Sequence, residues 1–190
     1  MLIDQTDNKI GLILSGGGAR AAYQVGVLRG IANILPKDTK NPFHIISGTS
    51  AGALNAVALA SHAPRFRTAV RVLEYVWKEI SCDQIYSPNS SNFVSSISSL
   101  LLPLLGSKNP EDPVALLNSD PLRALLTRVV NLKRIQRHID MGLLDAVSVT
   151  ASNYSSGESV SFFQAMKGLP DWKGPHRKGI RTQLTLEHLM

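Results

Sequence analysis

The sequence predicts an α/β fold with a mostly parallel sheet flanked by helices. Short apolar runs alternate with helical patterns through the first 80 residues, in the order strand, helix, strand, helix. This order favours a parallel sheet because each crossover helix returns the chain to the same edge. Later in the chain, two runs of alternating apolar and polar residues predict further strands.

The first expected strand and helix lie between residues 9 and 35. Lys9–Ser15 is a short apolar run that predicts a buried strand. A helix is expected over Ala19–Leu35, and Pro36 ends it. Its apolar side chains repeat every three or four residues: Tyr23, Val27, Ile31 and Ile34.

The remaining elements follow from the same patterns. We expect a strand over 42–47 and helices over 51–62, 65–80 and 119–130. Two strands are expected within 143–154 and 158–165, joined at Ser155–Gly157. Residues 184–190 predict the first turns of an apolar helix.

Composition indicates one globular domain, residues 1–190. The chain has 190 residues, of which 44% are hydrophobic and 18% charged, enough to bury one core. A loose excursion rich in serine and proline is expected at 87–113. Cys82 is the single cysteine, so neither a disulfide framework nor a metal site is expected. The N-terminus shows neither a signal peptide nor a membrane span, so we expect a cytoplasmic protein.

The net charge of +6 gathers in two basic segments, Leu122–Ile139 and Trp172–Arg181. Such segments favour anionic partners. No zinc finger, aromatic RNA-binding motif or helix-turn-helix accompanies them, so nucleic acid is not an expected partner. Peripheral contact with an anionic membrane surface remains open.

Gly48, Ser50 and Gly52 form a Gly-x-Ser-x-Gly motif between an expected strand and an expected helix. This is the arrangement of a nucleophile elbow, in which a sharp turn exposes the serine hydroxyl. The amide groups at the start of the following helix favour the negative charge that develops during acyl transfer. Short glycine and serine motifs also occur in ordinary tight turns, so the motif alone leaves both interpretations open.

Gly16, Gly17 and Gly18 follow the first expected strand and leave several backbone amides uncovered. The lysine of a P-loop is absent. The spacing Gly16-x-Gly18-x-x-Ala21 matches a dinucleotide-binding fingerprint, which also needs an acid about 20 residues further on. Asp38 has that spacing, but it lies in a connection and not at the end of a strand. If the first two strands are parallel neighbours, both glycine segments meet at one edge. The amides of Gly16–Gly18 would then face an oxyanion formed by Ser50.

The paired segments GGGARAAYQVGVL and GTSAGALNA resemble the signatures of the patatin-like phospholipase family. LDAVSVTASNYSSGESVSFF and TLEHLM are similar to later segments of bacterial members, so the resemblance covers nearly the whole chain. It implies a patatin-like α/β fold and a lipid acyl hydrolase with a serine-aspartate dyad and no metal or cofactor. By the same resemblance, Ser50 is the nucleophile, and the oxyanion region comprises Gly16, Gly17, Gly18 and Arg20.

The chain departs from the family pattern in one respect, because it contains no Asp-Gly dipeptide for the dyad aspartate. Asp145 and Asp171 are the nearest substitutes by position, and both are interpreted as surface acids. We therefore expect an N-terminal portion of a longer protein, with a fold incomplete at its C-terminus. A C-terminal segment or a second chain would complete the domain, and this portion alone would be nearly inactive.

A serine-acid-histidine triad is the weaker alternative, with His176 or His188 as the base. His44 and His62 are interpreted as structural, and His138 as part of a basic helix face. The sequence thus predicts a lipid acyl hydrolase acting on phospholipid or another acyl ester. A nucleotide-binding domain and a catalytically silent lipid-binding fragment remain as alternatives.

Overall fold

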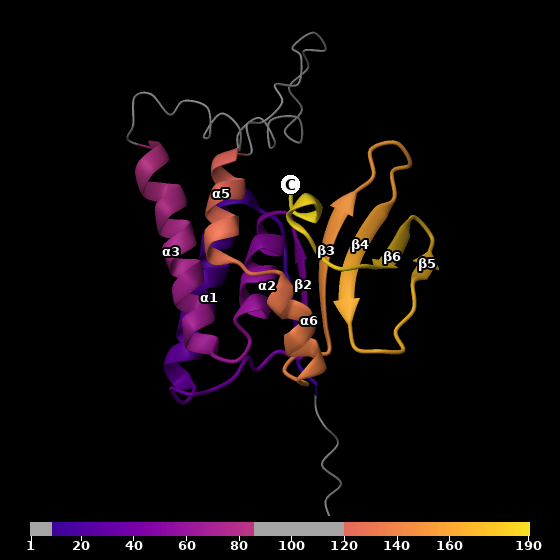
Figure 1. Cartoon of the computed structure of the whole chain (residues 1–190). Coiled ribbons are helices and arrows are strands. Elements are labelled where there is room, and N and C mark those ends of the chain that lie inside the picture. Colours follow the sequence, from indigo (N-terminus) through magenta and orange to yellow (C-terminus); the bar gives the residue numbers. More distant parts are fainter. Residues whose placement is uncertain (1–8, 86–119) are drawn as a thin grey trace, which may run out of the picture.

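The computed structural model describes residues 9–85 and 120–190 (Figure 1). The excursion expected at 87–113 lies outside these residues. The described strands are β1 Gly11–Leu14, β2 Ile45–Thr49, β3 Ala146–Ser152, β4 Ser159–Ala165, β5 Trp172–Gly174 and β6 Arg177–Arg181. The helices are α1 Ala21–Ile34, α2 Ala51–Ser61, α3 Phe66–Ile85, α5 Asp120–Val129 and α6 Lys133–Asp140, with 3-10 turns η1 Gly18–Arg20 and η3 Leu186–His188.

The six strands form one mixed sheet in the order β1-β2-β3-β4-β6-β5. The pairs β1–β2, β2–β3 and β4–β6 are parallel, whereas β4 runs antiparallel to β3 and β5 antiparallel to β6. The expected α/β class and the parallel pairing of the first two strands are therefore confirmed. The β5–β6 hairpin was not predicted, because its sequence shows charge rather than alternation.

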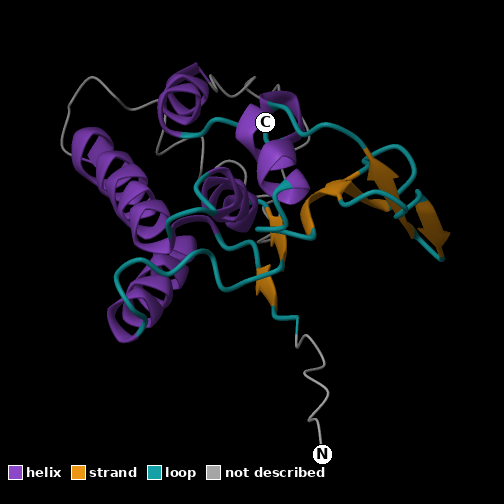
Figure 2. Ribbon diagram, turned by 60° about the horizontal axis from the view of Figure 1, so that its bottom comes forward, coloured by secondary structure: helices purple, strands orange, loops and turns teal. Residues whose placement is uncertain are grey.

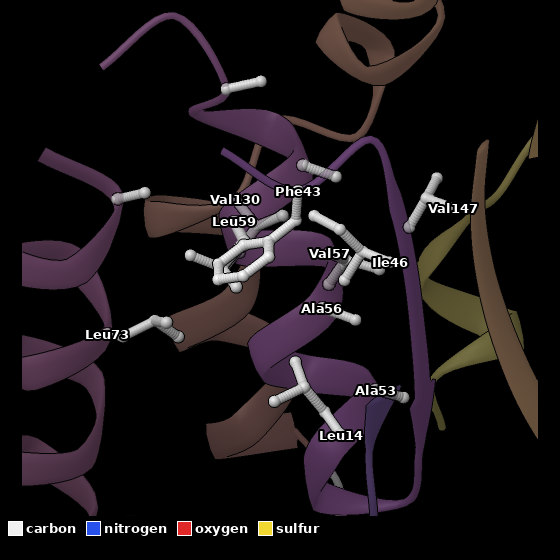
Figure 3. Close-up of a cluster of buried hydrophobic side chains, with 14 of the residues drawn as sticks. Leu14, Phe43, Ile46, Ala53, Ala56, Val57, Leu59, Leu73, Val130 and Val147 are labelled. Carbon is white, nitrogen blue, oxygen red and sulfur yellow. The ribbon is translucent and has the colours of Figure 1, made fainter. Parts of the chain in front are cut away.

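Helix α2 lies at the centre of the molecule, between the sheet and the other helices (Figure 2). It contacts β1, β2 and β3 on one side and α1, α3 and α6 on others. Every residue from Asn55 to Ser61 is buried, as expected for a helix that is covered all round. Figure 3 shows Ala56, Val57 and Leu59 of this helix within the apolar core.

Three of the four apolar side chains whose spacing predicts α1 are exposed, whereas Ile31 is partly buried against the core. Tyr23 and Ile34 are 78% and 85% exposed, and Val27 is also exposed. The core side is formed by the smaller side chains Ala21, Val25, Leu28 and Ala32. The helix carries two apolar stripes, and the smaller one allows the closer approach to its neighbours.

The C-terminal segment forms the single 3-10 turn η3 instead of an apolar helix. Arg123 of α5 donates two hydrogen bonds, of 2.8 and 3.1 Å, to the carboxylate of Glu187. This pair holds the C-terminal turn beside α5 (Figure 1). The Arg123 guanidinium also lowers the pKa of the Glu187 carboxyl.

Candidate active site

Ser50 lies at the turn between β2 and α2, with φ at 53° and ψ at −128°. An L-residue rarely adopts this positive φ, and the strain persists only where the surrounding structure enforces it. Thr49 ends the strand and Ala51 begins the helix, so the reversal is confined to Ser50. This is the backbone geometry expected of a nucleophile elbow.

Gly48 and Gly52 are required by close backbone packing at this turn. A Cβ at Gly48 would overlap the Gly52 carbonyl and lie 2.6 Å from the Cα of Ala53. A Cβ at Gly52 would overlap the Leu14 carbonyl and lie 2.6 Å from the Ser15 carbonyl oxygen. The first turn of α2 therefore rests directly on the backbone at the ends of β1 and β2.

The glycine segment after β1 lies beside Ser50. A Cβ at Gly16 would be 3.1 Å from the Cβ of Ser50 and 3.8 Å from its Oγ. This proximity follows from the parallel register, in which Leu14 pairs with Gly48 and both strands end at the same edge. The two glycine segments thus meet as the sequence predicted.

The loop Gly16–Arg20 turns tightly into α1. Gly18 has φ at 55°, and the Gly17 carbonyl accepts a hydrogen bond of 3.1 Å from the amide of Arg20. In the described part of the chain, no oxygen accepts a hydrogen bond from the amide of Gly16 or Gly17. The loop therefore offers free amide donors next to Ser50, and Arg20 is exposed at its end.

The family model for patatin-like phospholipases matches residues 12–168. The chain belongs to this family. The sequence resemblance is thereby confirmed, and the family match covers both glycine segments and the strands and helices around them.

Two relatives match shorter stretches of the chain. Mouse patatin-like phospholipase domain-containing protein 7 is 39% identical over 70 residues, which cover 37% of this chain and 5% of the relative. A cGAMP-activated phospholipase of Pseudomonas aeruginosa is 40% identical over 55 residues, covering 29% of this chain and 16% of the relative. The chain thus spans a small part of the relatives that it matches.

Among solved structures, the ExoU–SpcU heterodimeric complex from the type III secretion system of Pseudomonas aeruginosa is similar to this chain. The TM-score is 0.36 with 20% sequence identity, and the match covers 81% of this chain and 32% of that one.

The two acids considered as substitutes for the family's dyad aspartate lie away from Ser50. The amide of Asp145 donates a hydrogen bond to the carbonyl of His44, the residue before β2 begins. The extended chain from His44 to Ser50 is about 20 Å long, so Asp145 lies at the opposite end of the strand. Its carboxylate lies 2.7 Å from the Nζ of Lys9 and is only 16% exposed, so it is a covered ion pair and not a surface acid. Asp171 is exposed and accepts a hydrogen bond from the amide of Arg181.

His188 has the wrong tautomer for the base of a triad. Its Nδ1 accepts a hydrogen bond of 3.1 Å from the amide of Thr185, so the neutral ring carries its proton on Nε2. A triad base needs the reverse arrangement, with the lone pair on Nε2 facing the serine. His176 lies in the β5–β6 turn, three strands from β2, or about 14 Å.

The other histidines are held by the fold, away from the elbow. The Nδ1 of His44 accepts a hydrogen bond from the amide of Ile10. His62 lies at the far end of α2, about 18 Å from Ser50, and burial lowers its pKa. His138 is buried and bonds to the carbonyl of Ala60, so the prediction of an exposed basic face was wrong for this residue.

Asp38 is exposed in the turn that precedes β2, at the edge opposite the glycine loop. A dinucleotide site needs its acid at the carboxyl end of the second strand.

Among the described residues there is no cluster of three His, Cys, Asp or Glu able to hold a metal ion. Within the same residues no helix is long and apolar enough to cross a membrane.

Two polar side chains near the loop were missed by the sequence analysis. Asn55 of α2 is 0% exposed, and Gln24 of α1 is half-buried. Asn55 donates to the Ala21 carbonyl and to Gln24, and Gln24 donates to the Ser15 carbonyl. Their signal in the sequence is an amide residue one or two turns after each glycine segment, within an otherwise small or apolar stretch.

Proposed function

We propose that the protein is a lipid acyl hydrolase in which Ser50 is the nucleophile. The observation that carries this proposal is the strained serine at the β2–α2 turn, with the glycine loop so close to it that a Cβ at Gly16 would lie 3.1 Å from the Cβ of Ser50. Family membership supports a lipid ester as the substrate. A phospholipid or another acyl-ester lipid is the class that we propose.

In the proposed reaction, the Oγ of Ser50 attacks the ester carbonyl carbon while its proton passes to a base. The negative charge moves to the carbonyl oxygen, where the amides of Gly16, Gly17 and Gly18 and the start of α2 stabilise it. The alcohol leaves with a proton, and an acyl-enzyme forms at Ser50. Water then attacks the acyl-enzyme and releases the fatty acid.

We propose an aspartate outside residues 1–190 as the base, as in the family's serine-aspartate dyad. Among the described acids considered as the base, Asp145 pairs with Lys9, and Asp171 accepts a hydrogen bond from the amide of Arg181. Glu158 and Glu187 are bound to Lys178 and Arg123, which lower the pKa of each carboxyl and make it a weaker proton acceptor.

An anionic membrane surface is the proposed site of action. Helix α6 presents Lys133, Arg134 and Arg137 as exposed cations, and the β5–β6 hairpin adds Lys173 and Arg177. Such cations attract anionic headgroups, and each contributes about 1 kcal/mol near a charged bilayer. Salt should weaken this contact because the charges are exposed.

The test is fatty-acid release from phosphatidylcholine vesicles containing phosphatidylserine, by the full-length protein and by its Ser50→Ala variant. We expect release by the wild type and none above background by the variant, with equal binding of both to the vesicles. Binding without release by the wild type would favour the silent lipid-binding alternative. Equal release by both proteins would exclude Ser50 as the nucleophile.

A further inference from the structure

A chain of three hydrogen bonds runs from α3 to the start of the glycine loop. The indole Nε1 of Trp77 donates to the Oδ1 of Asn55 at 2.8 Å. The Nδ2 of Asn55 donates to the Oε1 of Gln24 at 3.0 Å, and the Nε2 of Gln24 donates to the Ser15 carbonyl at 2.8 Å. Donors and acceptors therefore alternate in one direction along the chain of bonds.

The orientation of both amides is fixed by their partners. An indole N–H can only donate, so the Asn55 atom that faces Trp77 must be its oxygen. A backbone carbonyl can only accept, so the Asn55 atom facing Ala21, at 3.1 Å, must be its nitrogen. The same reasoning places the nitrogen of Gln24 against Ser15 and its oxygen against Asn55.

These bonds hold both ends of the glycine loop. Ser15 is the residue before Gly16, and Ala21 is the residue after Arg20, so the loop lies between the two carbonyls that Gln24 and Asn55 bind. Asn55 itself belongs to α2, the helix that begins directly after Ser50. The loop is therefore tied at both ends to the helix that carries the proposed nucleophile.

We infer that Gln24 and Asn55 are positioning residues that fix the glycine loop relative to Ser50. This inference rests on the proposed function, because it gives the amides of the loop their role as oxyanion donors. Oxyanion stabilisation depends on donors held at a set distance before the charge develops. A displacement of about 1 Å can cost about a hundredfold in rate.

Gln24→Leu is the most direct test, because Gln24 is half-buried and the variant keeps most of the side-chain volume. In the full-length protein acting on p-nitrophenyl butyrate, we expect kcat to fall about ten- to a hundredfold with KM within about twofold. The oxyanion forms only after the substrate has bound, in the tetrahedral intermediate and the transition states on either side of it. Misplaced loop amides should therefore lower kcat and leave substrate binding unchanged.

Gln136→Leu is the matched control. Gln136 is also a half-buried glutamine on a helix, and it also gives one hydrogen bond and accepts one, with Asp140 and Gln164 as partners. It lies on α6 beside Gln164, which pairs with Val147 near the start of β3. We expect its kcat to stay within about twofold of the wild type.

Gln24→Glu adds a pH-dependent readout that a purely structural role would not give. The ionised carboxylate faces the Ser15 carbonyl with no donor, whereas the protonated acid donates to Ser15 and accepts from Asn55, as glutamine does. The ratio of variant kcat to wild-type kcat should therefore rise as the pH is lowered from 8 to 5. Using the ratio removes the pH dependence of the catalytic base.

Two results would overturn the inference. A kcat within twofold of the wild type for Gln24→Leu, together with an inactive Ser50→Ala variant, would overturn the positioning role and leave the proposed function intact. An active Ser50→Ala variant would overturn both. Asn55→Leu is a secondary variant because its buried site makes misfolding the expected complication.

Discussion

The two glycine segments of the site differ in what surrounds them. After β2, Gly48 and Gly52 are packed so closely against backbone that no Cβ fits at either position. After β1, a Cβ at Gly17 would lie 3.4 Å from the Cβ of Arg20, an ordinary contact, and among the described residues the amides of Gly16 and Gly17 have no acceptor. Neighbouring backbone atoms therefore require the glycines of the elbow, whereas Gly17 and Gly18 of the loop are required by their own backbone conformations, with φ at 159° and 55°.

Glycine therefore serves two purposes in one site: it allows close backbone packing after β2 and an unusual backbone conformation after β1. Loss of an elbow glycine should appear as loss of folded protein. Loss of a loop glycine should appear as loss of rate in a protein that is still folded. Measuring stability and rate on the same variants separates the two.

Gly52→Ala should have the largest effect. The new methyl group would overlap the Leu14 carbonyl, a backbone atom that cannot turn aside, so β1 or α2 must move. We expect a loss of about 4 kcal/mol or more in unfolding free energy, measured by urea denaturation, or no soluble protein. A wild-type denaturation midpoint would show that the turn is less closely packed than described.

Gly17→Ala should lower the free energy of unfolding by about 1 to 3 kcal/mol, because alanine is strained at the φ of 159° and ψ of 16° that Gly17 adopts, although its methyl group has room. Alanine keeps the amide, but relief of the strain would move this amide away from the oxyanion, so kcat on a short-chain ester should fall by up to roughly a hundred- to a thousandfold, the range for complete loss of one oxyanion donor. Gly18→Ala would likewise be strained, at a φ of 55°, and should also lose stability. Normal turnover by both variants would assign the loop another role.

Ser50→Gly and Ser50→Ala should differ in stability although both lack the hydroxyl. Glycine adopts the φ of 53° at this position without strain, whereas alanine keeps the strain of the wild type. We expect Ser50→Gly to be more stable than Ser50→Ala by about 1 kcal/mol in thermal or urea unfolding. Equal stability would mean that the turn stores no strain at Ser50.

Gly30→Ala should have the smallest effect and the opposite sign. Gly30 is exposed in the interior of α1, and a Cβ there would meet no atom within 4 Å. Alanine should stabilise the protein by about 0.5 to 1 kcal/mol and leave kcat unchanged. A loss of rate would show that the conformation of α1 itself affects the loop.

The elbow and its neighbouring loop could be predicted from the sequence because they depend on local rules. A strand followed by glycine and serine at fixed spacing leads to a helix, and the parallel pairing of β1 with β2 brings both turns together. The strand-helix order thus determined the position of Ser50 relative to Gly16.

Other features depend on packing between distant segments and were missed. Helix α1 has two apolar stripes, and periodicity alone could not show that the alanine-containing one faces the core. The β5–β6 hairpin gains its pairing from β4, a partner that its own charged sequence does not reveal. In the sequence, Asn55 is one polar residue in an alanine-rich helix. Only the fold brings Trp77 and Gln24 within hydrogen-bond distance of it.

Covalent labelling of the full-length protein with a fluorophosphonate tests the central claim, that Ser50 is an activated nucleophile. The tryptic peptide of residues 41–65 contains Ser50 together with Ser47 and Ser61, so fragmentation of this peptide by mass spectrometry identifies the labelled residue. We predict one adduct, at Ser50, and no adduct on the peptide in Ser50→Ala. An adduct at a different residue, or undiminished labelling of the Ser50→Ala protein, would contradict the account.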